Sequence, residues 1–200
     1  MKSTSMITRA ALALILAAWA IGCEEGSLVG VQNPQDESGN QPLQFIQLPP
    51  SHGLKKVVTA SQLITKDKGG VLSLDYSYEP DSGKFDEVRI KMTLDFPPNS
   101  VNQDMLVTVT LDDRVLLTNV DLNFSPSPVT FNEPADLDYE VWGIDLTGLS
   151  ANDAKLYYNN KSAGRWDPVQ GQKVNINRNK GYIRSRGAKI PHFSQYAFCR

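Results

Sequence analysis

The chain has 200 residues, with 20 Lys and Arg against 22 Asp and Glu, two His and two Cys. The near-zero net charge excludes a basic nucleic-acid binder as the default class, so we expect no nucleic-acid partner. Two cysteines exclude a disulfide-dense small scaffold and a four-cysteine zinc site. The length suits one domain of ordinary size, alone or with a tail.

Residues 1–22 have the composition of a secretory signal peptide. Lys2 and Arg9 are their only charged residues, and an unbroken apolar run occupies residues 10–21. This run is shorter than the roughly 20 residues that a membrane-spanning helix needs. A positive start, a short apolar run and small residues at its end together predict an export signal.

The signal ends at Ala20-Ile21-Gly22, and Cys23 follows directly. This ending resembles the lipobox of bacterial lipoproteins, in which the cysteine is lipidated, the signal is cut before it and the new amine is acylated. The resemblance implies lipidation at Cys23 and a bacterial cell-envelope protein held on the membrane by that lipid. It also favours the outer membrane where the cell has one, because Glu24 is not the Asp that favours the inner membrane in this family.

Removal of the signal changes the charge and the cysteine count of the chain. Without Lys2 and Arg9, 18 basic side chains face 22 acidic ones. Mild acidity argues against a polybasic patch that binds anionic lipid. With Cys23 lipidated, Cys199 is the only thiol left, and we expect no intrachain disulfide.

The polar composition of residues 23–53 predicts a flexible tether between lipid and domain. Gly, Asn, Gln, Ser and Pro dominate this stretch, and few of its residues could build a core. The exception is the apolar segment Leu43–Leu48. We expect it either as a first strand or as a segment that docks on the domain.

From residue 54 to 200 the dominant pattern is alternation of apolar and polar residues. Three runs show it, within residues 88–96, 105–111 and 116–124, and turn-forming residues separate them. Such runs place apolar side chains on one face of a strand and polar ones on the other. The sequence therefore predicts a mostly β domain, an antiparallel β-sandwich or an open barrel.

The second half carries several short motifs in a fixed order. They are Phe124-Ser125-Pro126, Phe131 to Leu137 around Pro134, Gly164-Arg165-Trp166 and His192-Phe193-Ser194. Over about residues 70–198 this order resembles the ZU-five domain, a β-rich module of netrin receptors, ankyrins and tight-junction scaffold proteins. The resemblance implies a sandwich-like fold and a non-enzymatic interaction role.

His192-Phe193-Ser194 is the sharpest candidate for chemistry. In some ZU-five proteins the chain cuts itself between Phe and Ser of such a tripeptide. There the Ser194 hydroxyl would attack the preceding carbonyl and His192 would take its proton. We favour the alternative, a closing strand over residues 191–198 with Phe193 inside, because a cut would release only residues 194–200.

Three aromatic residues, Tyr157, Tyr158 and Trp166, flank the turn-forming segment 159–164. This spacing predicts a hairpin. Cross-strand packing explains the aromatic side chains, and a stacking platform for sugar is the alternative. We expect packing.

Acidic and basic clusters complete the candidates. Calcium could bind the carboxylates of Asp112-Asp113 or of the pair Asp136 and Asp138. Because no DxDxDG loop is present, we expect these residues to be acids in turns and expect no metal. No glycine-rich phosphate loop or G-x-S-x-G motif occurs, so we expect no cofactor. The basic residues within 178–189 are expected as exposed strand-face charge.

The sequence thus predicts a membrane-anchored envelope lipoprotein whose β domain is a non-enzymatic interaction module. Its expected partners are the membrane, through the lipid on Cys23, and an unknown envelope protein or polysaccharide. The alternatives are a self-cleaving domain at the His-Phe-Ser motif and a carbohydrate-binding module.

Overall fold

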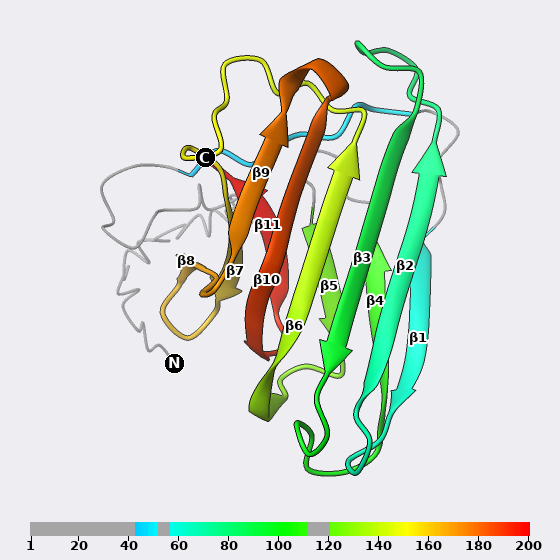
Figure 1. Ribbon diagram of the computed structural model, residues 1–200, viewed down its shortest axis with the longest axis vertical. Helices are drawn as coiled ribbons and strands as arrows, with labels where there is room; N and C mark the ends of the chain where they lie inside the picture. Colours follow the sequence, from blue (N-terminus) through cyan, green and yellow to red (C-terminus); the bar gives the residue numbers. More distant parts are fainter. Residues whose placement is uncertain (1–42, 52–56, 112–120) are drawn as a thin grey trace, which may run out of the picture. The chain divides into compact units, whose positions relative to one another are not determined.

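A computed structural model of the chain describes residues 43–51, 57–111 and 121–200. This part is mostly β, and two antiparallel sheets pack against each other (Figure 1). The predicted antiparallel β-sandwich is therefore confirmed, and the open barrel is not the form adopted. The predicted signal peptide, Cys23, the tether up to residue 42, and Asp112-Asp113 lie outside the described residues.

One layer is a six-stranded sheet with the order β1-β4-β5-β11-β7-β8. Its strands are β1 (Val58–Ile64), β4 (Met105–Leu111), β5 (Asp121–Ser125), β11 (Gln195–Cys199), β7 (Lys155–Asn160) and β8 (Arg165–Pro168).

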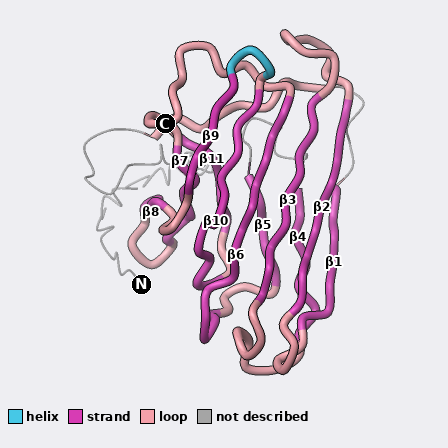
Figure 2. The backbone as a smooth tube through the Cα atoms, in the orientation of Figure 1, coloured by secondary structure: helices cyan, strands magenta, loops and turns pink. Residues whose placement is uncertain are grey.

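The second layer is a five-stranded sheet with the order β2-β3-β6-β10-β9. Its strands are β2 (Gly70–Tyr78), β3 (Val88–Phe96), β6 (Thr130–Trp142), β10 (Tyr182–His192) and β9 (Lys173–Asn177). A short 3₁₀ turn, η2 (Arg178–Lys180), joins β9 to β10 and is the one cyan segment in Figure 2.

The alternation in the sequence explains why these segments are strands with one buried face. In β3 the residues from Val88 to Phe96 alternate strictly between buried and solvent-facing positions. In β4, Val107, Val109 and Leu111 are buried in the same manner. The third predicted run continues into β5, where Leu122 and Phe124 are buried; its first part, residues 116–120, lies outside the described residues. The core fills the space between the two sheets.

The apolar segment Leu43–Leu48 docks on the domain, which is one of the two alternatives expected for it. The backbones of Gln44 and Arg200 exchange two hydrogen bonds of 2.9 Å, and Ile46 N–H donates to the Phe198 carbonyl at 2.9 Å. Leu43, Ile46 and Leu48 are buried. Because β5 pairs only with residues 195–197 of β11, this segment continues the ladder along the rest of that strand.

Ion pairs cover the outer face of the five-stranded sheet. Lys189 lies 2.5 Å from Asp136, and Arg184 lies 2.9 Å from Asp138 and 3.0 Å from Glu140. These contacts join neighbouring strands β6 and β10. Two of the basic residues within 178–189 are thereby paired with acids, and Asp136 and Asp138 serve as ion-pair partners.

Candidate functional site

The tripeptide His192-Phe193-Ser194 lies at a corner where the chain passes from one sheet to the other. His192 ends β10 in the five-stranded sheet, and β11 begins at Gln195 in the six-stranded sheet (Figure 1). At the corner, Phe193 N–H donates to the Val129 carbonyl at 2.9 Å. The expected single closing strand over residues 191–198 is therefore wrong, because the chain changes sheets within it.

The corner changes which side chains face the core. In one continuous strand, Phe193 and Tyr196 would point to opposite faces. Here both are buried in the main core, and Phe193 is only 3% exposed. Its ring centroid lies 4.8 Å from that of Phe131 and 5.8 Å from that of Phe124. Burial of Phe193, which the sequence predicted, is confirmed.

Polar side chains at the corner contact backbone carbonyl oxygens. Ser194 Oγ donates to the Asn159 carbonyl at 2.6 Å, and the Tyr196 hydroxyl donates to the His192 carbonyl at 2.6 Å. His192 Nδ1 lies 3.4 Å from the Phe193 carbonyl oxygen. In an acyl shift the Ser194 proton must pass to His192, whereas here it is directed at the Asn159 carbonyl. The geometry therefore favours a structural role for the motif.

We expect the Phe193–Ser194 bond to stay intact in the purified protein. Trypsin cuts after Lys189, and the peptide that follows, residues 190–200, spans this bond. The expected result is this intact peptide as the sole species in mass spectrometry, identical in amount for wild type and Ser194→Ala. A peptide of residues 190–193 that appears in wild type and not in Ser194→Ala would contradict the structural role.

The three aromatic residues around the β7–β8 hairpin do not share one face. Tyr157 and Tyr158 are consecutive in β7 and therefore point to opposite sides of the sheet. Tyr158 packs edge-on against His192, with ring centroids 5.0 Å apart. Trp166 is only 8% exposed and packs edge-on against Phe45 at 5.1 Å. The hairpin is as predicted, and its aromatic residues pack in two separate places.

A small cluster covers the outer face of the six-stranded sheet at β11. We call this the outer cluster; it consists of Leu43, Phe45, Tyr157, Trp166, Ala197 and Cys199. Cys199 is fully buried in it and is a free thiol. Burial raises the pKa of the Cys199 thiol, so the thiol stays protonated at neutral pH.

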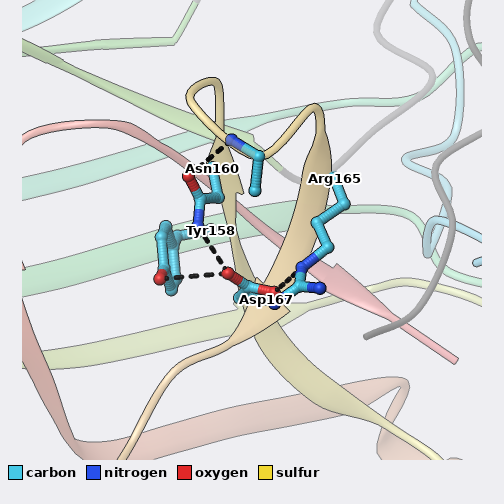
Figure 3. A network of polar contacts seen from close by, with 5 residues as sticks. Tyr158, Asn160, Arg165 and Asp167 are labelled. Carbon is cyan, nitrogen blue, oxygen red and sulfur yellow. Dashed lines mark hydrogen bonds and ion pairs between the residues drawn. The ribbon is translucent and has the colours of Figure 1, made fainter. Parts of the chain in front are cut away.

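A polar network lies on the other side of the same hairpin (Figure 3). The Asp167 carboxylate accepts hydrogen bonds from Asn160 Nδ2 at 2.7 Å, from Arg165 Nε at 2.7 Å and from the Tyr158 hydroxyl at 3.3 Å. Asn160 Oδ1 in turn accepts from the Ala163 N–H in the turn at 3.2 Å. One carboxylate thus ties together β7, β8 and their turn.

The network fixes the charge state of Asp167. Desolvation acts to raise the pKa of this carboxyl, but the hydrogen bonds from Asn160 and Arg165 outweigh it and hold the pKa below its ordinary value. Burial, followed by the nearby Asp167 charge, raises the pKa of Tyr158. At neutral pH the site therefore presents an ionised carboxylate beside a neutral phenol.

Asp167 was not singled out from the sequence, although a signal for it existed. The hairpin pairs Tyr158 with Asp167 and Asn160 with Arg165. Once the turn at residues 159–164 was predicted, this register would have placed the four polar groups together.

In residues 43–51, 57–111 and 121–200, no group of three or more His, Cys, Asp or Glu side chains is placed to hold a metal ion. In the same residues, no helix is long and apolar enough to cross a membrane.

Comparison with known proteins gives no match: no family model, no curated protein and no solved structure matches the chain. The structure by itself defines the class, a protein with an antiparallel β-sandwich of two packed sheets. The lipoprotein and ZU-five resemblances stay predictions.

Proposed function

We propose that the protein is a bacterial envelope lipoprotein, anchored through lipid on Cys23, whose β-sandwich is a non-enzymatic, ZU-five-like interaction module. The observation that carries this proposal is the order of residues 1–23. A positive start, the apolar run 10–21 and the small residues before Cys23 follow one another as an export and lipidation signal requires. Glu24 favours the outer membrane where the cell has one.

The geometry of the sandwich supports an interaction role for the domain. The residue types expected for self-cleavage, His192 and Ser194, contact backbone carbonyls at the corner between the sheets. The β7–β8 hairpin holds ionised and polar groups in fixed positions on the surface. Such groups can recognise a partner without reacting with it.

Lipid explains how a polar domain would stay on the membrane. Each buried methylene contributes about 0.8 kcal/mol, so one acyl chain holds a protein weakly and several hold it firmly. Replacement of Cys23 by serine is therefore expected to abolish incorporation of radioactive palmitate and to remove the lipid-anchored mature form. The measurement is autoradiography of the purified protein after labelling in cells.

The chain offers a matched control in its second cysteine. Cys199→Ala removes a buried thiol in the outer cluster and is expected to incorporate as much palmitate as wild type. Unlabelled wild-type protein, or equal label in Cys23→Ser and wild type, would contradict the proposed anchor.

A further inference from the structure

A cleft of about 400 Å³ opens between the two sheets beside the polar network. One wall comes from Tyr158 of β7 with Arg165 and Asp167 of β8, and the other includes Lys189 of β10. The gap exists because β9 pairs with β10 only as far as Arg186. Beyond that point, in the described part of the chain, only the bridge between Gln170 and Lys189 flanks this side of β10.

Each wall of the cleft carries one cation that is paired with a carboxylate and still about half exposed: Arg165 lies 2.7 Å from Asp167, and Lys189 lies 2.5 Å from Asp136. The Arg165 side chain is 47% exposed and the Lys189 side chain is 49% exposed. Arg165 contacts Asp167 through Nε, and no described residue takes a hydrogen bond from its two terminal amino groups. Those groups form the planar fork that pairs with a carboxylate through two parallel hydrogen bonds.

The donors and acceptors are fixed before any ligand arrives. Asp167 already accepts three hydrogen bonds, which leaves about one of its four lone-pair positions for a ligand hydroxyl. The Tyr158 hydroxyl donates to Asp167 and keeps acceptor capacity of its own. An ionised acceptor, a phenol oxygen and a guanidinium within one cleft match a ligand that carries both hydroxyl groups and an acid.

The apolar part of the lining consists of Val169 and three proline rings, Pro134, Pro168 and Pro191. Proline has no N–H to add to a β ladder. Pro168 lies in β8, the last strand of its sheet, and Pro191 lies where the pairing of β10 with β6 shifts register. An extended peptide that bound here as an added strand would meet proline-interrupted strand edges on both sides of the cleft. A sugar ring needs no strand edge, because its C–H faces can pack on the proline and tyrosine rings.

We propose that this cleft binds an acidic saccharide, with Arg165 on the sugar carboxylate, Asp167 and Tyr158 on its hydroxyl groups, and Lys189 as the second cation. The inference rests on the proposed interaction function, because it assigns that module a polysaccharide partner. It is independent of lipid on Cys23, so either can fail without the other.

Calorimetric titration of the purified full-length protein in detergent tests the site. The probe is trigalacturonate, with its uncharged methyl ester and triglutamate as comparison ligands. We expect trigalacturonate to bind. The methyl ester should bind at least about tenfold more weakly, because it lacks the carboxylates that pair with the guanidinium. Triglutamate should also bind at least about tenfold more weakly, because it lacks the sugar rings that pack on the lining. Arg165→Gln should weaken trigalacturonate binding by about tenfold or more.

A matched variant removes a similar ion pair elsewhere. Arg89 pairs with Asp75 at 2.6 Å between β2 and β3, with 49% of the Arg89 side chain exposed, and Arg89→Gln should leave binding unchanged. Absence of trigalacturonate binding up to about 10 mM overturns the proposal, since weaker binding is not specific recognition. Equal binding of triglutamate or of the ester also overturns it, as does unchanged affinity in Arg165→Gln.

Discussion

Replacement of Phe193 by alanine is expected to lower the free energy of unfolding by about 3–5 kcal/mol, the usual cost of removing a buried phenylalanine. Phe193 is 3% exposed, and its ring contacts the rings of Phe96, Phe124 and Phe131. A truncation there leaves a cavity at the corner that joins the two sheets. Because folded domains have only about 5–15 kcal/mol in total, this variant should be close to unfolding.

Chemical denaturation followed by intrinsic fluorescence measures this loss. Ser194→Ala is the neighbouring comparison, because it removes the 2.6 Å hydrogen bond to the Asn159 carbonyl and leaves the ring in place. We expect about 1 kcal/mol for that change. If Phe193→Ala lowers the free energy of unfolding no more than Ser194→Ala does, the Phe193 ring is not packed in the core.

Replacement of Trp166 by alanine is expected to expose the buried thiol of Cys199. Trp166 packs on Phe45, which is paired with Cys199 across the sheet, and all three belong to the outer cluster, in which the exposed fraction of Cys199 is 0%. We expect a loss of about 3 kcal/mol in the free energy of unfolding. The reaction of the thiol with a disulfide reagent should accelerate at least about tenfold, since local opening becomes easier.

The rate of this reaction is measured in a Cys23→Ser background, where Cys199 is the only thiol. Trp142→Ala is the control, because Trp142 packs on Tyr182 at 5.1 Å on the outer face of the other sheet. That variant should leave the thiol as slow to react as in the parent chain. Rapid reaction of Cys199 in the parent itself would show that the outer cluster does not cover it.

Local alternation was enough to predict several strands and their buried faces. Residues 88–96 and 105–111 alternate between apolar and polar, and both form strands with the expected inward side chains. The β7–β8 hairpin was predicted from its turn-forming residues in the same way. These predictions succeed because a strand with one buried face and one solvent-facing side alternates apolar and polar residues within its own sequence.

Non-local features left no such signal. The passage from one sheet to the other at Phe193 breaks the alternation, so period-two reasoning placed Phe193 and Tyr196 on opposite faces although both are in the core. The outer cluster that buries Cys199 includes Phe45, which pairs with Cys199 but is far from it in the sequence. The cleft depends on where β9 stops pairing with β10, which no local pattern encodes.

The intact mass of the protein extracted from membranes reports both the lipid on Cys23 and the integrity of the C-terminal corner. We expect one species that begins at Cys23, carries a diacylglyceryl thioether and an acylated amine, and retains residues 194–200. A chain that keeps residues 1–22, or one that begins at an unmodified Cys23, would contradict the lipid anchor. A species that lacks residues 194–200 would contradict the structural role of His192-Phe193-Ser194.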